Sequence, residues 1–267
     1  TGTVHFETSP STRSLPAPAP APTGRENPLH KLRELLHLDP AAPEWLRIVS
    51  WLLSTFRPNS SCPILILRGP SGCGKSLAAR LLRSLIDPAV ATLTPVPLNA
   101  RELATLARQN YVLAFDHIAR LTPRLADALC RLATGAGISY REKGHAEPIQ
   151  LYLKRPIILT VTVDFVPPPD LVARALIVTL PDLTPETRRS EPELYVAFRD
   201  AFPQILGGLC DTVAAVLRPA TLRPRPHPTR HITSFQCGRA AAQLLNCSKK
   251  DIYRAFQTPD SHLPEDT

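Results

Sequence analysis

A run of eight residues has the types and spacing of a phosphate-binding loop. Its three glycines let the backbone bend so that successive N–H groups point toward phosphate oxygens. We expect Lys75 to reach the β- and γ-phosphates of a nucleoside triphosphate, and the hydroxyl of Ser76 to hold Mg²⁺. The predicted nucleotide-binding residues of this region are Gly69, Pro70, Ser71, Gly72, Cys73, Gly74, Lys75, Ser76 and the adjoining Leu77.

The residues on either side of the loop predict a strand before it and a helix after it. Residues 64–67 form a short apolar run suited to a buried parallel strand. Apolar residues then recur at helical spacing, at Leu77, Leu81, Leu82 and Leu85. The loop would therefore lie at a helix N-terminus, whose partial positive charge favours anions. The alternative is a glycine-rich turn with a surface lysine, which the motif and its context together disfavour.

A second candidate for the same chemistry is Asp116. The apolar segment 111–115 directly before it predicts a strand. An apolar strand that ends in aspartate beside a phosphate-binding loop holds Mg²⁺ in P-loop enzymes. We therefore expect Ser76 and Asp116 to be the metal ligands. The alternative is that Asp116 caps the helix that is predicted to follow within a few residues.

Composition limits the classes of protein that the chain can represent. Its 267 residues are enough for one large α/β domain and a smaller helical one. The six cysteines are scattered, without Cys-x-x-Cys pairs, so we expect reduced thiols and neither a zinc site nor a disulfide framework. No apolar run approaches the ~20 residues that span a bilayer, and no signal-peptide pattern is present at the start. We expect a soluble, cytoplasmic protein without a membrane partner.

Two further features concern partners. The net charge of +8 is compatible with a polyanionic partner, but charge alone does not identify one. The arginine-rich segment 218–231 is either a solvated basic connector or a nucleic-acid contact. The chain begins at Thr1 and contains no methionine. We therefore expect it to be a piece of a longer polypeptide with a further N-terminal domain.

Composition and periodicity divide the chain into five predicted segments. The first is a disordered, Pro/Ala-rich linker, because alternating prolines favour an extended chain that buries no core. The third contains the phosphate-binding loop, and within it two alternating runs around 138–141 and 149–153 predict a hairpin. The five segments are the linker 1–25, an N-terminal helical segment 26–60, a P-loop core 61–185, a C-terminal helical bundle 186–257 and a disordered tail 258–267.

From Pro63 to about Phe256 the chain resembles the helicase part of primase–helicase proteins of prophages and mobile elements, in superfamily 3 of the AAA+ class. The similar tracts, in order, are LRGPSGCGKSLAARLLRSLIDP, YVLAFDHI, DALCRLATGAGISYRE, RPIIL, PDLVARAL, PQILGGLCD and RHITSFQCGRAAAQLL. The resemblance implies a three-layer α/β sandwich with a parallel sheet and a helical lid. It also implies a homo-oligomeric, hexameric ring that hydrolyses ATP with Mg²⁺ and moves along single-stranded or forked DNA. In such helicases a β-hairpin carries a lysine that contacts the DNA strand. The resemblance therefore indicates Lys143 or His145 as the DNA-contacting residue of this chain.

Departures from the family pattern fall on the residues expected to support hydrolysis. His117 stands where the family usually has asparagine and where many AAA+ ATPases have glutamate. Thr160 replaces an asparagine that helps to sense the γ-phosphate, and Pro168 replaces an arginine. A threonine can still hydrogen-bond to phosphate, whereas proline replaces neither the charge nor the donors of arginine. Arg174 is then the candidate arginine finger acting across a subunit interface, and its alternative role is a surface salt bridge.

Three functions stay open on the sequence. The first is a DNA-stimulated ATPase of a replication helicase, with Lys75, Asp116 and Arg174 as its catalytic residues. The second, favoured by the three departures, is a hydrolysis-impaired assembly module or remnant that binds nucleotide. The third is a small-molecule kinase, which the C-terminal bundle and the hairpin disfavour. The loop contacts phosphates and not the base, so it does not distinguish ATP from GTP.

Overall fold

The computed structural model describes residues 12–20, 27–57, 61–141, 147–216, 232–242, 245 and 247–256. Its centre is a sheet of four strands in which every neighbouring pair is parallel. The order across the sheet is β2-β5-β1-β6, so the strand before the phosphate-binding loop lies in the interior. The strands are β1 (Ile64–Arg68), β2 (Leu113–Ile118), β5 (Ile157–Val161) and β6 (Ala175–Thr179).

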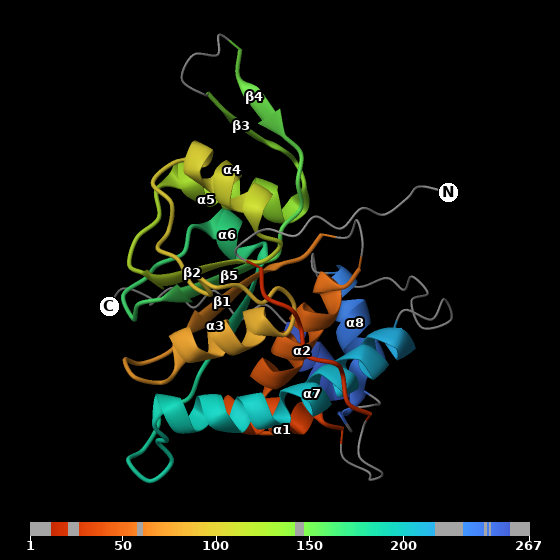
Figure 1. Cartoon of the computed structure of the whole chain (residues 1–267). Helices are drawn as coiled ribbons and strands as arrows, with labels where there is room; N and C mark the ends of the chain where they lie inside the picture. Colours follow the sequence, from red (N-terminus) through yellow and green to blue (C-terminus); the bar gives the residue numbers. More distant parts are fainter. Residues whose placement is uncertain are drawn as a thin grey trace.

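Helices cover both faces of this sheet, as Figure 1 shows. Successive side chains of a strand point to opposite faces. Alternate residues of β1 therefore belong to two different hydrophobic cores, one on each face of the sheet. Ile64 and Ile66 pack in the core of one face with α4, α5 and α6, whereas Leu65 and Leu67 pack in the other with α2 and α3. The expected three-layer α/β sandwich with a parallel sheet is therefore confirmed. The helices are α1 (Leu29–Leu35), α2 (Pro43–Thr55), α3 (Lys75–Ser84), α4 (Ala100–Gln109), α5 (Pro123–Thr134), α6 (Pro169–Val172), α7 (Glu191–Val216), α8 (Ile232–Ala242) and α9 (Lys249–Phe256).

Local sequence explains where several helices begin and end. The Thr122 side chain accepts a hydrogen bond from the Leu125 amide, and Pro123 occupies the first turn of α5, where its missing N–H has no cost. Gly135 ends that helix with a φ of 80°. Before α7, the amide of Ser190 donates to Glu193 and the amide of Glu193 donates to the Ser190 hydroxyl, which is a capping box.

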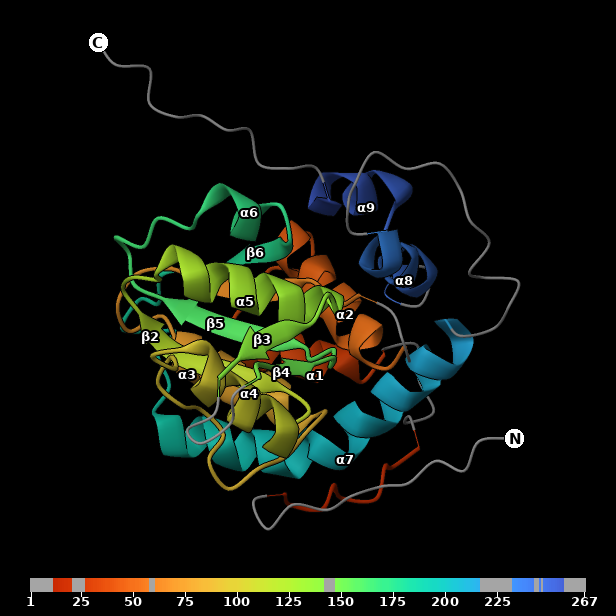
Figure 2. The ribbon, with the colours of Figure 1, turned by 90° about the horizontal axis from the view of Figure 1, so that it is seen from above.

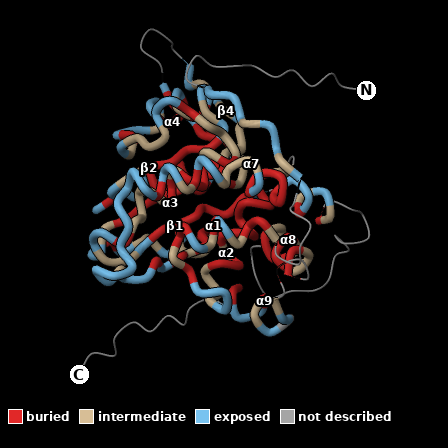
Figure 3. The backbone as a smooth tube through the Cα atoms, turned by 60° about the horizontal axis from the view of Figure 1, so that its bottom comes forward, coloured by how far each residue is buried: buried red, intermediate tan, exposed pale blue. Residues whose placement is uncertain are grey.

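The C-terminal helices pack on the N-terminal helix α2. Trp51 of α2 is fully buried and its indole N–H donates to Pro63 O, 2.8 Å away. Arg47 reaches from α2 to two other elements, donating to Ala255 O of α9 at 2.6 Å and to Ile177 O of β6 at 3.0 Å. Figure 3 shows buried backbone extending from β1 into α2. The expected helical C-terminal part is therefore present, and it shares a hydrophobic core with α2.

Residues 12–20 differ from the expected disordered linker, because they lie against the folded body. Thr12 forms a β-bridge with Ala89, and the Arg13 amide donates to Pro88 O at 2.8 Å. Further on, the Ala19 amide donates to Pro203 O of α7, also at 2.8 Å, and Figure 2 shows this segment alongside α7. Prolines already hold such a segment extended, so ordering it costs little conformational entropy. We call residues 12–20 the N-terminal strap.

The predicted hairpin is present as β3 (Ile138–Tyr140) and β4 (Ile149–Leu151), which pair antiparallel. It extends beyond the layer of α4 and α5, away from the sheet (Figure 1). Its tip, with the DNA-contact candidates Lys143 and His145, lies outside the described residues, as do the connector 218–231 and the tail 258–267. None of the helices that the structure describes is long and apolar enough to cross a membrane.

Candidate nucleotide-binding site

The phosphate-binding loop connects the carboxyl end of β1 to the first turn of α3. Gly69 has a φ of 146°, and a Cβ on it would lie 2.7 Å from Leu180 O and 2.8 Å from the Cys73 sulfur. Gly74 has a φ of 85° at the N-cap of α3. Both positions require glycine, the first for space and conformation and the second for conformation. The loop therefore places backbone N–H groups at a helix N-terminus, as the sequence predicts.

Lys75, the first residue of α3, folds back over this loop. Its ammonium group donates to Gly69 O at 2.8 Å and to Pro70 O at 2.7 Å. Both acceptors are neutral carbonyl oxygens, which bind an ammonium group less strongly than a phosphate oxygen does. The lysine is therefore placed at the loop with partners that an anion can replace.

Ser76, Asp116 and Thr160 come together from three elements, α3, β2 and β5. The Ser76 hydroxyl donates to Oδ1 of Asp116 at 2.8 Å, and the Thr160 hydroxyl donates to the same oxygen. Thr160 is only 1% exposed. Asp116 lies within β2, while the N-cap of the following helix is Thr122, so the helix-cap alternative for Asp116 is wrong. A hydroxyl and a carboxylate next to a phosphate-binding loop are the hard oxygen ligands that Mg²⁺ prefers.

His117 has an unusual backbone conformation directly after this cluster. Its φ is 55°, which is rare for a residue other than glycine. The pairing of β2 with β5 shifts between Phe115 and Ile118, so His117 falls in an irregularity of the strand. The His117 amide donates to the Thr160 hydroxyl at 2.8 Å. Thr160 thus accepts from His117 and donates to Asp116, and fixes both.

A pocket of about 590 Å³ opens beside the loop. Six of the predicted residues line it, namely Ser71, Gly72, Gly74, Lys75, Ser76 and Leu77, whereas Gly69, Pro70, Cys73, Asp116 and Thr160 are not among its lining residues. His117 and residues 162–164, which follow β5, also line it. Leu77, Leu183 and Leu194 provide apolar surface, while three arginines add positive charge. The lining residues are Ser71, Gly72, Gly74, Lys75, Ser76, Leu77, Arg80, His117, Thr162, Val163, Asp164, Leu183, Arg188, Arg189, Glu191 and Leu194.

Sequence reasoning missed the three arginines of this pocket. Arg80 could have been found, because it stands four residues after Ser76 and residues four apart share a helix face. Its guanidinium donates to Glu191 of α7 at 2.6 Å. Arg188 and Arg189 lie in the segment between β6 and α7, and no local pattern there indicates that this segment returns to the loop.

Arg174 lies away from this pocket, near the amino ends of β1 and β6, whereas the loop follows the carboxyl end of β1. β6 runs parallel to β1, with Ala175 opposite Ile64, so Arg174 precedes the strand while the loop follows the other end of β1. Because β1 has five residues that each rise about 3.3 Å, Arg174 and the phosphate-binding loop lie roughly 15–20 Å apart. Arg174 donates to the carbonyl oxygen of Asp170 at 2.9 Å and lies 3.3 Å from its carboxylate, with 38% of its side chain exposed. The surface ion pair is therefore present, and Arg174 does not reach the phosphate-binding loop of its own chain.

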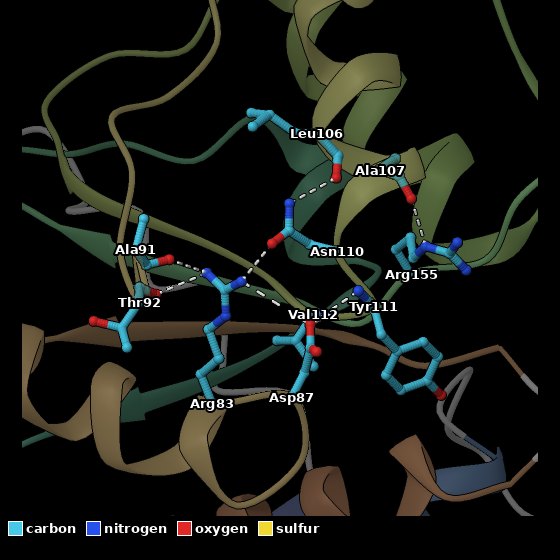
Figure 4. A network of polar contacts seen from close by, with 10 residues as sticks. All are labelled: Arg83, Asp87, Ala91, Thr92, Leu106, Ala107, Asn110, Tyr111, Val112 and Arg155. Carbon is cyan, nitrogen blue, oxygen red and sulfur yellow. Dashed lines mark hydrogen bonds and ion pairs between the residues drawn. The ribbon is translucent and has the colours of Figure 1, made fainter. Parts of the chain in front are cut away.

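A buried arginine joins the end of α3 to the start of β2 (Figure 4). Arg83 is 2% exposed; it donates to Ala91 O at 3.1 Å, to Thr92 O at 2.9 Å and to Asn110 Oδ1 at 2.8 Å. Burial lowers the pKa of Arg83, and the negative charge of Asp87 partly opposes this. The guanidinium therefore holds the chain after α3 against the residues that begin β2.

Asp87 completes this connection from the other side. Its Oδ2 accepts from the amides of Tyr111 at 2.9 Å and Val112 at 2.8 Å, just before β2. The Tyr111 hydroxyl donates to Thr55 O of α2, and the Arg155 guanidinium lies 5.9 Å from the Tyr111 ring centre. These contacts fix α3 relative to β2, and so fix Ser76 relative to Asp116.

The parallel sheet, with a phosphate-binding loop between β1 and α3, gives the chain the α/β fold of a P-loop protein. The chain belongs to the family described as actinomycete integrative conjugative element replication protein, which matches residues 29–249. The family is one of replication proteins of mobile elements, which agrees with the broader part of the resemblance. A prophage origin stays a prediction.

Two solved structures are similar to this chain over most of its length. The apo C-terminal region of NrS-1 is similar with a TM-score of 0.52 and 14% identity, over 76% of this chain and 48% of that one. This chain thus spans about half the length of that region. A full-length MCM homolog from Methanopyrus kandleri matches with a TM-score of 0.47 and 16% identity, over 90% of this chain and 61% of that one. No curated protein matches the chain in sequence.

Proposed function

We propose that this protein binds ATP with Mg²⁺ and hydrolyses it as the motor of a helicase in replication of its element. The observation that carries the proposal is the hydrogen bond between Ser76 and Asp116 at the phosphate-binding loop. It brings together the two oxygen ligands that P-loop ATPases place on the metal of Mg·ATP. Membership of a family of replication proteins supports a role on DNA.

Each residue of the site then has a distinct role. The loop amides and Lys75 bind the phosphates, and Lys75 exchanges its carbonyl partners for phosphate oxygens. Ser76 and Asp116 hold the metal, which would neutralise charge that develops on the phosphate oxygens. Thr160 keeps Asp116 and the backbone of His117 in place. The His117 imidazole, which lines the pocket, is the group available to orient water toward the γ-phosphate.

Arg174 acts on the site of a neighbouring subunit in this proposal. Arg174 lies near the amino end of β1, whereas the loop follows its carboxyl end, so Arg174 cannot contact the nucleotide of its own chain. An arginine that meets the transferred phosphate group from a second subunit stabilises the charge of the transition state. The proposal therefore includes a homo-oligomeric ring, a hexamer by the resemblance, with the active sites between subunits.

The β3–β4 hairpin is the proposed contact to single-stranded or forked DNA. It projects beyond the helices of one face of the sheet (Figure 1), and Lys143 and His145 are proposed to lie at its tip. A lysine there would bind the phosphate backbone without reading sequence. The net charge of +8 is compatible with this partner.

Steady-state ATP hydrolysis with Mg²⁺, with and without single-stranded DNA, tests the proposal. The wild-type chain is compared with Lys75→Ala, which removes the phosphate-binding cation. We expect turnover that DNA stimulates and that Lys75→Ala abolishes. ATP binding without turnover above that of Lys75→Ala, in either condition, would exclude the motor.

A second candidate is a nucleotide-dependent assembly module with little hydrolysis. The observation in its favour is His117, which occupies the position expected to orient water and offers no carboxylate. Size-exclusion chromatography with and without a non-hydrolysable ATP analogue separates the two functions when it is combined with the turnover assay. Assembly that depends on nucleotide but proceeds without hydrolysis would favour the module.

A further inference from the structure

We propose that Arg188 binds the phosphate chain of the nucleotide from the side opposite the loop, and so links the nucleotide to α7. This inference rests on the proposed function, because it assumes that a nucleoside triphosphate occupies the pocket. Arg188 belongs to residues 180–190, the segment that leads from β6 to α7. We call these residues the connecting segment.

The connecting segment touches the phosphate-binding loop at two separate points. At its start, the carbonyl of Leu180 lies so close to Gly69 that a Cβ there would be 2.7 Å from its oxygen. Near its end, Nη2 of Arg188 lies 3.5 Å from the position that a Cβ on Gly72 would occupy. The Arg188 guanidinium therefore lies over the middle of the loop. Arg188 and Gly72 both line the 590 Å³ pocket.

Charge separates Arg188 from the other two arginines of the pocket. Arg80 is neutralised by Glu191, 2.6 Å away. Arg189 lies near Glu193, whose pKa is lowered mainly by hydrogen bonds from the Ser190 backbone and side chain and, less strongly, by the positive charge of Arg189. Among the residues that the structure describes, no carboxylate lies within ion-pair distance of Arg188, and its Nη2 has only Leu183 O at 3.5 Å. An exposed guanidinium next to an anion-binding loop then has its donors available for phosphate oxygens.

The backbone around Arg188 connects it firmly to α7. Its amide donates to Thr184 O at 2.9 Å, which closes a turn within the connecting segment. Two residues later, Ser190 and Glu193 form the capping box of α7. A guanidinium that binds phosphate therefore ties the N-terminus of α7 to the nucleotide, and the C-terminal helices respond to whether phosphate is bound.

Nucleotide affinity tests this contact. A fluorescent ATP analogue is titrated into the wild-type chain, Arg188→Ala, Arg188→Lys and Arg189→Ala. Inorganic triphosphate is used as a competitor, because it carries the phosphate chain without base or ribose. We expect Arg188→Ala to weaken both ATP and inorganic triphosphate about ten-fold or more, since charge-assisted hydrogen bonds are lost. Arg188→Lys recovers part of the loss because it keeps the charge.

Arg189→Ala is the matched control, because it removes the same charge one residue away in the same pocket. Equal losses in Arg188→Ala and Arg189→Ala would show a general effect of charge and would overturn the contact, as would an unchanged affinity in Arg188→Ala. A loss for ATP without a loss for inorganic triphosphate would place Arg188 on the base or ribose and would also overturn it. Failure of the wild-type chain to bind ATP would instead contradict the proposed function.

Tryptic cleavage gives a second, independent measurement. Trypsin cuts after arginine, and Arg188 and Arg189 are exposed in the connecting segment. We expect inorganic triphosphate to protect this segment in the wild-type chain and not in Lys75→Ala. Because Arg188→Ala also removes the cleavage site at residue 188, the variants are compared by cleavage after Arg189. Protection there that is partly kept in Arg188→Lys and absent in Arg188→Ala supports the link to α7, whereas cleavage that triphosphate leaves unchanged in the wild-type chain overturns that link.

Discussion

Ser76 and Asp116 are 40 positions apart in sequence and joined by a 2.8 Å hydrogen bond between the hydroxyl and Oδ1. One lies in the first turn of α3 and the other within β2, so their meeting depends on how helix and strand pack. Arg83, near the end of α3, and Asp87, just after it, fix that packing further along the chain. The two metal ligands of the proposed site are thus held in contact by the fold.

Asp116→Asn should remove the effect of Mg²⁺ on nucleotide binding. Asparagine keeps the shape and can still accept hydrogen bonds from Ser76 and Thr160, but it loses the negative charge that favours a divalent cation. We expect the wild-type chain to bind ATP at least ten-fold more tightly with Mg²⁺ than with EDTA, and the variant to show little difference. Fluorescent ATP titration measures both. A Mg²⁺ effect of wild-type size in Asp116→Asn would remove Asp116 from the metal site.

Thr160→Val should destabilise the fold through the polar contacts of the buried hydroxyl. The substitution keeps the size of the side chain but leaves the His117 amide without its acceptor and removes one donor from Asp116. The unsatisfied buried groups should lower the free energy of unfolding by about 1–3 kcal/mol. Urea denaturation measures the change.

Thr160→Ser is the control for that substitution. It retains the hydroxyl and removes one methyl group, which should cost about 1 kcal/mol. It should also keep more ATP turnover than Thr160→Val, since Asp116 and His117 stay in place. A Thr160→Val variant as stable and as active as Thr160→Ser would show that the hydroxyl does not position either residue.

Much of this site could be predicted because its signals are local. The spacing of glycines before Lys75, the apolar residues 64–67 and the strand before Asp116 each lie within a few residues of one another. The position of Arg188 over Gly72 could not be predicted, because it depends on the path of a connecting segment more than 100 residues further along the chain. The N-terminal strap was missed for the same reason. Its proline-rich composition correctly predicts an extended conformation. Composition does not predict the tertiary contact between this segment and α7.

Gly207→Ala should release the N-terminal strap from α7. A Cβ on Gly207 would overlap the carbonyl oxygen of Ala19, so the strap has to move. Alanine also favours the helix itself by about 1 kcal/mol, which separates loss of the strap from loss of the helix. We expect faster tryptic cleavage after Arg13, with α7 intact by circular dichroism.

Gly208→Ala is the neighbouring control. Its Cβ would meet side-chain atoms of Pro28 at 3.1 Å and of Asn27 at 3.2 Å, rather than the strap. We expect cleavage after Arg13 at nearly the wild-type rate. If Gly207→Ala also leaves that rate unchanged, the strap does not depend on close approach to α7.

His37 should make the stability of the protein depend on pH. It directly follows the C-cap of α1 with a φ of 52°, and its amide donates to Glu34 O at 3.0 Å. Its Nε2 is buried and has no hydrogen-bond partner within the described part of the chain. Burial, followed by the positive charge of Arg189, lowers the pKa of His37 below its ordinary value of 6.5.

The sign of the effect follows from that shift. The unfolded chain binds the proton more readily than the folded one, so the contribution of His37 is fully present above pH 6.5 and is lost as the pH falls through that value toward the folded pKa. His37→Asn removes the titrating group, and asparagine tolerates a positive φ. We expect the free energy of unfolding of the wild-type chain to fall more between pH 7.5 and about pH 5 than that of His37→Asn, in urea denaturation at each pH. Parallel pH profiles for the two chains would show that His37 has the same pKa folded and unfolded.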